Sequence, residues 1–255
     1  NHKIELNYNI QNTDRAIGTR LASEITTTKG MSTLNEDFFT VNFHGSAGQS
    51  FGAWSVQGTT LRVYGDANDY VAKGLSGASI SIKIAEDSNL ISNENTIIGN
   101  TVLYGATSGK LFAAGQAGER FAVRNSGAIS VIEGCDSNGC EYMTGGNIVI
   151  LGDVGDNFAA GMTGGMAFVY NLNQQFEKKV NSETVVWQKP ETEHWINYLK
   201  NLIIEHYTET NSKIAEKIIN NFNEEINNFI QICPKEMINK LKNPLTKKLN
   251  FKEVS

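Results

Sequence analysis

One phrase occurs three times in this chain, and its recurrence restricts the folds that are open to the sequence. The copies run over Tyr64–Ala78 (YGDANDYVAKGLSGA), Tyr104–Ala122 (YGATSGKLFAAGQAGERFA) and Leu151–Val169 (LGDVGDNFAAGMTGGMAFV). Self-similarity at a period of tens of residues is typical of a solenoid. Each copy holds one glycine, a gap of nine or ten residues, and two glycines three apart: Gly65, Gly74 and Gly77; Gly105, Gly115 and Gly118; Gly152, Gly161 and Gly164.

The apolar runs in this region are short, and they alternate or continue over roughly five residues, which is typical of strands. A turn that recurs in every layer needs a positive φ or a missing Cβ, and glycine provides both. We therefore expect coils stacked at about 4.8 Å, with these glycines at the corners. A glycine-rich antiparallel sandwich is the alternative that short strands also allow. The expected strands cover 38–43, 59–64, 79–84, 100–104, 128–134, 147–151 and 166–170.

Glycine and proline divide the chain into parts of different character. All 24 glycines lie between Gly18 and Gly165, whereas the three prolines are Pro190, Pro234 and Pro244. We expect a lead-in with a capping helix over 1–37, a glycine-rich repeat region over 38–172, and a linker with a helical segment over 173–255.

Helical periodicity is predicted at both ends of the repeat region. Near the N-terminus, capping residues at 12–14 precede Ile17, Leu21 and Ile25, which share one helical face, and Gly30 fits a C-terminal cap. In the last part, apolar residues recur at helical spacing through about 192–242, and Pro234 should interrupt them. They are Trp195, Leu199, Leu202, His206, Ile214, Ile218, Phe222, Ile226, Phe229, Cys233, Met237 and Leu241.

Composition excludes several classes of protein. A net charge of -5 argues against a nucleic-acid partner, which requires a concentrated positive field. No apolar run reaches the length of about 18 residues that spans a membrane. Three cysteines and no visible export signal predict a reduced, cytoplasmic setting. The late lysines predict a solvated tail: Lys240, Lys242, Lys247, Lys248 and Lys252.

The motifs of common active sites are missing or incomplete. No two glycines are separated by a single residue, so the dinucleotide fingerprint is absent, and GATSGKL does not fit the phosphate loop. Cys135 and Cys140 are too few for an iron–sulfur or four-cysteine zinc site. His44 beside a glycine turn fits a structural role better than a base. Carboxylates at comparable turns could align to hold a cation, but acidic residues also suit turns by themselves. They are Asp66, Asp69, Glu119, Asp153 and Asp156.

Several long phrases, in order, resemble the C-terminal domain of the glutamate synthase large subunit. They include NTDRAIGTRLASEI, GSAGQSFGAW, GDANDYVAKGLSGA, GNTVLYGATSGKLFAAGQAGERFAVRNSGA and GCEYMTGG, and they extend over nearly the whole chain from about Asn12. The G-x-x-G-x-x-x-G pattern of that domain occurs at Gly45, Gly48 and Gly52.

The resemblance implies a right-handed parallel β-helix that carries no catalytic, cofactor-binding or metal-binding residue of its own. The parent enzyme hydrolyses glutamine in an amidotransferase domain and passes ammonia through a tunnel to a flavin domain. There 2-oxoglutarate becomes glutamate with FMN and a three-iron cluster. Its amidotransferase and FMN domains would be the partners of this chain. Cys135 departs from the family pattern, and alanine replaces glycine at Ala122 and Ala159.

We expect, on this resemblance, a non-catalytic structural domain or subunit that positions those two domains. A flank that includes Met31, Phe38, Trp54 and Tyr142 could contact them. Two alternatives remain: a free-standing scaffold subunit of another oxidoreductase complex, and a β-helical lyase acting on acidic sugars. A lyase should show basic residues and carboxylates along one face, whereas the basic residues of the repeat are scattered.

Overall fold

The structure is a computed structural model that describes residues 3–31 and 34–246. Three of the lysines in the predicted tail, Lys247, Lys248 and Lys252, lie outside the described residues. The strands are β1 (Ile4–Ile10), β2 (Phe39–Ala47), β3 (Thr59–Ala67), β4 (Ser76–Lys83), β5 (Thr96–Ile98), β6 (Ser108–Ala114), β7 (Gln116–Ala117), β8 (Ser126–Ile132), β9 (Thr144–Ile150), β10 (Gly164–Tyr170), β11 (Val185–Gln188) and β12 (Phe229–Pro234). The α-helices are α1 (Thr19–Lys29), α2 (Phe176–Lys179), α3 (Glu193–Thr210), α4 (Lys213–Asn220) and α5 (Phe222–Glu225).

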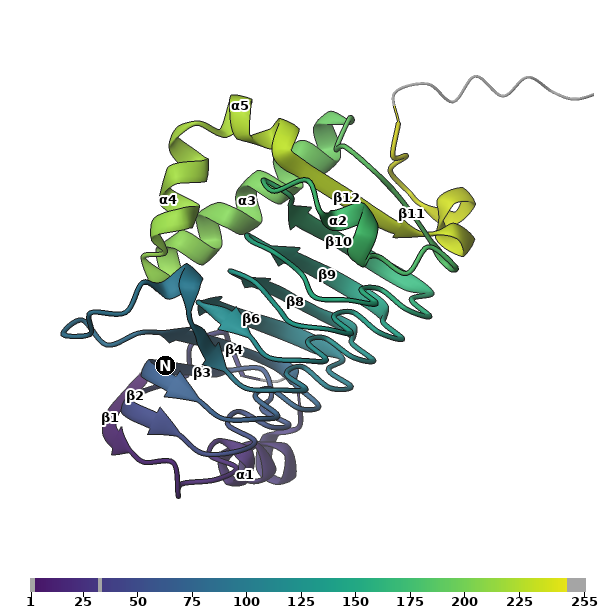
Figure 1. Ribbon diagram of the computed structural model, residues 1–255. Coiled ribbons are helices and arrows are strands. Elements are labelled where there is room, and N and C mark those ends of the chain that lie inside the picture. The colour runs from purple at the N-terminus through teal and green to yellow at the C-terminus, as the bar shows by residue number, and fades with distance from the viewer. Residues whose placement is uncertain (1–2, 32–33, 247–255) are drawn as a thin grey trace, which may run out of the picture.

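The strands form one mixed, mostly parallel sheet of twelve strands (Figure 1). Its order is β1-β2-β3-β4-β6-β8-β9-β10-β12-β11, and the short strands β5 and β7 lie off this path. Pairing is parallel from β1 to β10, and β12 is antiparallel to both β10 and β11.

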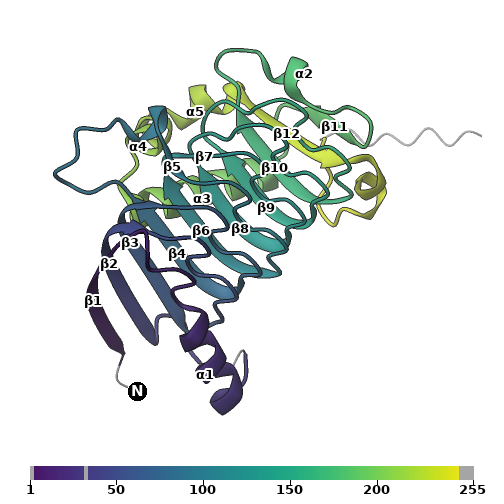
Figure 2. The same ribbon diagram turned by 60° about the horizontal axis from the view of Figure 1, so that its bottom comes forward.

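Stacked turns connect successive parallel strands on the side opposite the sheet (Figure 2). In six successive turns, every second residue over a stretch of five has a φ between 52° and 70°. The N–H groups of most of these residues donate to carbonyls of the neighbouring turns: Ser50 to Asp69, Ala72 to Phe51, and Gly105 to Val123, for example. We call this arrangement the turn ladder. Its three columns are Ser50, Tyr70, Thr101, Arg120, Asn138 and Asn157; Gly52, Ala72, Leu103, Ala122, Cys140 and Ala159; and Trp54, Gly74, Gly105, Arg124, Tyr142 and Gly161.

The prediction of a mainly β, right-handed parallel β-helix is wrong. Residues 3–31 and 34–246 form a single mixed, mostly parallel sheet with helices, and no closed solenoid. The physical reason lies in the turn ladder, because residues with left-handed φ at every second position cannot form the extended strands that further sheets would need. Residues 100–104, expected as a strand, belong to this ladder, with Thr101 and Leu103 at positive φ.

Two apolar layers hold the sheet. One face packs on the turns, where Phe51, Phe121 and Phe158 are fully buried. The other face carries α3 and α4 over the later strands (Figure 1), and Phe168 packs there against the helical residue Trp195, with ring centroids 6.2 Å apart. Both faces of β6 to β10 are therefore covered, as is usual for parallel strands.

The helical predictions hold in part. Helix α1 begins at Thr19 after Gly18 rather than at 12–14, where the Asp14 carboxylate instead accepts the Gln11 N–H within a turn. Gly30 caps the helix as predicted, and its N–H donates to the Thr26 carbonyl. The periodic stretch was wrongly extended through residues 229–234, which form β12. No helix in the described ranges is long and apolar enough to cross a membrane.

Candidate functional site

The predicted turn glycines occupy several different environments. A Cβ on Gly45, Gly65 or Gly152 would collide with a carbonyl oxygen of the preceding layer. Gly48 approaches the Asn12 carbonyl in the same way, and Gly118 approaches the side-chain oxygen of Asn100. These five glycines allow the chain to pass close to its neighbouring layer.

The remaining glycines lie in the turns and at the strands. Gly52, Gly74, Gly105 and Gly161 belong to the turn ladder, and Gly105 has open space where a Cβ would be. Gly105 is therefore the counterpart of Gly74 and Gly161, whereas the phrase spacing aligned it with Gly65 and Gly152. Gly115 directly follows β6, and a Cβ on it would meet the Ile97 side chain. Gly77 lies in β4 and Gly164 in β10.

The acidic turn residues do not converge on one point. Asp69, Glu119 and Asp156 occupy equivalent places in the turn ladder, where their carbonyls accept from the preceding turn. The carboxylate of Asp69 accepts from the Asn100 backbone at 2.8 Å, and that of Asp156 pairs with Lys179 at 2.6 Å. In the part of the chain that the structure describes, no group of three or more His, Cys, Asp or Glu residues is placed to hold a metal ion.

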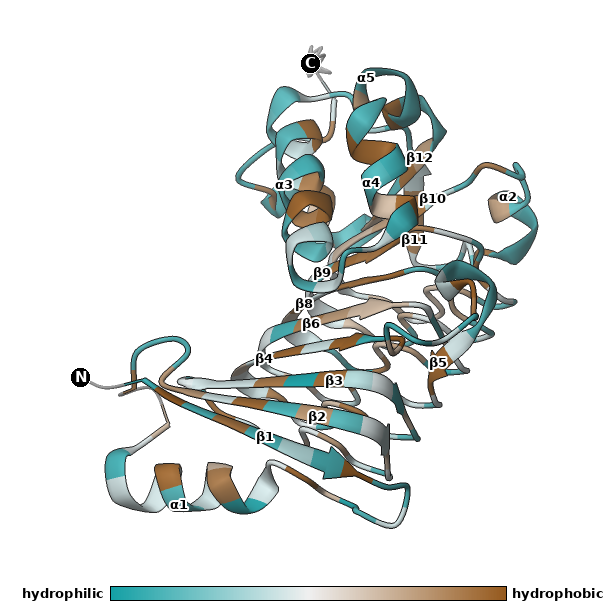
Figure 3. Ribbon diagram, turned by 90° about the vertical axis from the view of Figure 1, so that its left-hand side faces the viewer, coloured by the Kyte–Doolittle hydropathy of each residue, from teal (hydrophilic) through white to brown (hydrophobic). Residues whose placement is uncertain are grey.

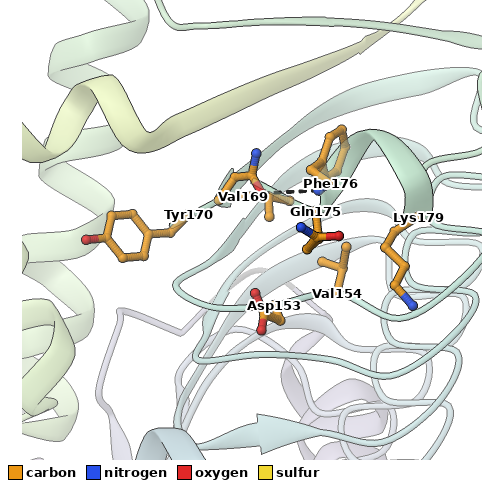
Figure 4. Close-up of a pocket in the computed structure, with 8 residues that line it drawn as sticks. Asp153, Val154, Val169, Tyr170, Gln175, Phe176 and Lys179 are labelled. Carbon is orange, nitrogen blue, oxygen red and sulfur yellow. Dashed lines mark hydrogen bonds between the residues drawn. The ribbon is translucent and has the colours of Figure 1, made fainter. Parts of the chain in front are cut away.

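A cavity of about 260 Å³ lies at the end of β10 (Figure 4). Asp153 and Lys179 are its charged lining residues, but the Asp153 carboxylate already accepts from Asn173 at 3.0 Å and Lys179 pairs with Asp156. The Phe176 N–H donates to the Asn171 side chain at 3.1 Å. These polar groups satisfy one another, so the cavity offers a ligand few unpaired partners.

The cysteines are buried and free. Burial raises the pKa of the Cys135 thiol to about 12, and burial also raises the pKa of Cys140. Cys233 is likewise buried, and its pKa is raised to about 11 by burial. A thiol must ionise to act as a nucleophile or a metal ligand, and these thiols remain protonated near neutral pH.

His44 lies on the surface, as do three residues of the predicted flank, Met31, Trp54 and Tyr142, whereas Phe38 is half-buried. The His44 ring stacks on Tyr64 at 4.9 Å and is exposed. Trp54 and Tyr142 are about half exposed, at 49% and 54%, and both belong to the turn ladder. The Trp54 ring lies directly over Gly74, and the Tyr142 ring lies directly over Gly161. Each ring can pack this closely on the backbone because the glycine has no Cβ.

Sequence reasoning missed a buried polar cluster between the sheet and the helices. Glu133 follows β8 and is 1% exposed; its Oε1 accepts from the Ser212 hydroxyl and lies 3.8 Å from His206 Nε2. Ser212 also caps α4 by accepting from the Ala215 N–H at 3.1 Å. Glu133 and Ser212 are 79 residues apart, and no local pattern links them.

Comparison with known proteins identifies the relatives of this chain. It is 59% identical over 243 residues to the "Glutamate synthase [NADPH] large chain" of Azospirillum brasilense, covering 95% of this chain and 16% of that protein. It is 47% identical over 234 residues to the protein of the same name from Bacillus subtilis, covering 91% and 15%. It is 48% identical over 227 residues to "Glutamate synthase [NADH]" of Schizosaccharomyces pombe, covering 89% and 11%.

The matched region is a minor part of each relative, so the chain spans about a sixth of their length or less. A family profile described as "GXGXG motif" matches residues 1–235, which is most of the chain. The described structure and these matches agree in extent, since the sheet runs from Ile4 to Pro234. The chain belongs to the GXGXG motif family.

Proposed function

We propose that this chain is a non-catalytic structural segment of a glutamate synthase large chain. In this proposal the parent enzyme converts glutamine and 2-oxoglutarate into glutamate in the cytoplasm, where free thiols such as those of this chain persist. The amidotransferase and FMN domains contact the segment, which fixes their relative position. The FMN and the iron–sulfur cluster belong to the parts of the parent enzyme outside this segment.

The observation that supports this proposal is the continuity of the backbone hydrogen bonds. The parallel strands bond each layer to the next on one side, and the turn ladder does the same on the other. A middle residue of each turn donates backwards, as Ala122 does to Val102, while its neighbours Arg120 and Arg124 donate forwards. A body that is bonded on both sides resists local bending, which is what a spacer between two active centres requires.

The described polar groups fit this interpretation as well. Arg62 of β3 pairs with Glu209 of α3 at 3.4 Å, and Lys110 of β6 pairs with Glu205 of α3 at 2.5 Å. These ion pairs join the sheet to α3 and are engaged within the fold. They therefore favour a structural role over a site that recognises an acidic sugar.

The test uses the complete enzyme and supplies nitrogen in two forms. Gly109→Ala loosens the sheet at β6, because a Cβ there would lie 2.5 Å from the Ala78 carbonyl oxygen. We expect it to reduce glutamate formation from glutamine more than glutamate formation from added ammonium, since dissolved ammonia does not need to pass between positioned domains. Gly105→Ala, with open space at its Cβ, is the matched control and should leave both rates near wild type.

Limited proteolysis shows whether the segment has loosened in each variant. If a protease cuts the Gly109→Ala segment readily while the glutamine-driven rate stays at the wild-type level, the segment does not position the domains.

A further inference from the structure

Strand β1 forms an open edge of the sheet. It pairs with β2 through seven residue positions, and the strand order ends there (Figure 3). Every residue from Ile4 to Asn9 is exposed, although the strand is as regular as its neighbours. Long exposed edges are normally blunted in folded proteins by charge, proline, bulges or a covering segment.

The backbone of β1 offers unpaired groups along this edge. The Ile4 N–H donates to the Phe38 carbonyl of the neighbouring layer at 2.9 Å. Alternate residues of a parallel strand bond to the same side, so Glu5, Asn7 and Asn9 direct their N–H groups away from β2. Within residues 3–31 and 34–246, no other strand pairs with β1.

The apolar side chains of β1 extend the row of buried core residues on β2, but no strand covers them on their other side in the described residues. Ile4, Leu6 and Tyr8 alternate along one face and are 39%, 40% and 53% exposed. Leu6 lies opposite Val41 and Tyr8 opposite Phe43, both buried core residues. The Tyr8 and Phe43 rings stack with centroids 6.1 Å apart, so the uncovered stripe is continuous with the core.

The opposite face of β1 carries an amide ladder. The Asn42 side-chain nitrogen on β2 donates to the Glu5 carboxylate at 2.9 Å and to the side-chain oxygen of Asn7 at 3.1 Å. A strand added beside β1 would thus meet apolar groups on one face and hydrogen-bonding groups on the other, which specifies its register.

We propose that an extended segment of the remaining large-chain polypeptide pairs with β1 and adds a further strand to the sheet. Its side chains alternate, with apolar residues beside Ile4, Leu6 and Tyr8, and with amide or basic residues beside Glu5 and Asn7. This inference rests on the proposed function, because it requires the segment to be part of a longer chain.

The covering segment comes from the same polypeptide rather than from a second copy. In the relatives, more than four fifths of the polypeptide lies outside the matched region, which provides ample chain in cis. A tethered segment acts at an effective concentration of about millimolar, well above that of a second copy in solution. Backbone pairing gives the affinity, and the alternating side chains give the specificity.

The test is residue-resolved hydrogen–deuterium exchange on the complete enzyme. We expect the outward amides of Glu5, Asn7 and Asn9 to exchange about a hundredfold or more slowly than those of an unstructured peptide. Exchange of these three amides at the unprotected rate would overturn the proposal. Protection that disappears on dilution would also overturn it, because it would identify a second copy as the partner.

A proline variant then tests the edge itself. Asn7→Pro removes one outward N–H and leaves the bonds of Leu6 and Tyr8 to β2, as edge strands tolerate. We expect it to abolish protection at Glu5 and Asn9, whereas Asn7→Ala, which loses the same side chain, should keep it. Leu6→Lys gives a second perturbation through the apolar face. Retained protection in both Asn7→Pro and Leu6→Lys would contradict strand addition.

These readouts are independent of the proposed positioning role. Exchange at β1 reports whether the edge is covered, and the comparison of glutamine with ammonium reports whether the segment positions other domains. Fast exchange with intact coupling would remove only the inference. Protected amides with an unaltered glutamine-driven rate, in a Gly109→Ala enzyme that proteolysis shows to be loosened, would remove only the positioning role.

Discussion

Two glycines four residues apart separate the two reasons why this fold uses glycine. Gly105 lies in the turn ladder with a φ of 63°, and a Cβ on it would meet nothing within 4 Å. Gly109 lies in β6 with a φ of 98°, and its Cβ would lie 2.5 Å from the Ala78 carbonyl oxygen and 3.0 Å from Leu75 Cδ2. Alanine at the first position adds conformational strain alone, and at the second it adds a collision as well.

Alanine at position 105 must adopt a left-handed backbone conformation, which lowers the free energy of unfolding by about 1 kcal/mol. Ala72, Ala122 and Ala159 already adopt this conformation in other turns, so the ladder accommodates it. At Gly109 the less usual φ costs about 2 kcal/mol. The Cβ falls about 0.9 Å short of the 3.4 Å at which ordinary contact begins, so β4 and β6 must separate locally. Weakening one or two backbone hydrogen bonds adds about 1 to 2 kcal/mol, for a total of about 3 to 4 kcal/mol.

Urea denaturation of the purified chain, followed by tryptophan fluorescence, measures this difference. We expect the free energy of unfolding to fall by about 1 kcal/mol for Gly105→Ala and by about 3 to 4 kcal/mol for Gly109→Ala. The m value should stay constant, because both variants expose the same surface on unfolding.

Equal losses in the two variants would refute the reasoning. If both fell by about 1 kcal/mol, the approach of Gly109 to Ala78 would have no energetic consequence, and if both fell by about 4 kcal/mol, the positive φ alone would dominate.

Three further outcomes follow from the buried and titrating groups. Burial raises the pKa of the Cys135 thiol from 9.0 to about 12, so little reactive thiolate forms in the folded chain. Its reaction rate with a thiol reagent should be about a thousandfold lower than that of a free thiol, and it should react fully in denaturant. Glu133→Gln should destabilise the chain by about 1 to 2 kcal/mol, since the hydrogen bond from Ser212 weakens. Ser212→Ala combined with it should add only the loss of the α4 cap, about 1 kcal/mol. The pKa of Glu225 is lowered chiefly by the hydrogen bond from the Tyr170 hydroxyl, 2.6 Å away. Its ionised form therefore stabilises the fold above the unfolded pKa, and this stability is lost as the pH falls through the lower folded pKa. A plot of unfolding free energy against pH should accordingly fall less steeply on its acid side in Glu225→Gln.

The sequence located the parallel strands because their apolar runs are bounded by glycine. Residues 59–64 and 166–170 illustrate this, since both lie inside observed strands. It failed at 100–104, where NTVLY contains β-branched and aromatic residues but folds into the turn ladder. There Val102 is buried between residues of positive φ, and the apolar run reflects burial rather than an extended backbone. A short apolar run cannot distinguish these cases by period alone.

The tertiary features of the candidate site were beyond sequence reasoning for a different reason. Glu133 meets Ser212 and His206 only because α3 and α4 fold back over the sheet, and the chain separation leaves no local signal. The β1 edge did carry a signal, since the apolar residues in IELNYNI alternate from Ile4 to Ile10. The segment was not predicted as a strand because about half of its residues are polar and it lies outside the glycine-rich repeat region.

The turn ladder explains how a glycine repeat can persist where few glycines remain. Of its eighteen positive-φ positions, only four are glycine: Gly52, Gly74, Gly105 and Gly161. What repeats in this chain is therefore a backbone conformation.

Each non-glycine residue in the left-handed conformation lowers the stability of the fold by about 1 kcal/mol. The turn ladder contains fourteen such residues, so the backbone strain that it holds is substantial. The strain persists because the turns before the last are over-determined. Their N–H groups alternate between the preceding and the following layer, and buried rings such as Phe51 and Phe121 fix the residues between them. Relaxing one turn would break bonds to two neighbours at once. We therefore expect the ladder to unfold as a unit, a cooperativity that fits the proposed role of the segment as a spacer between domains.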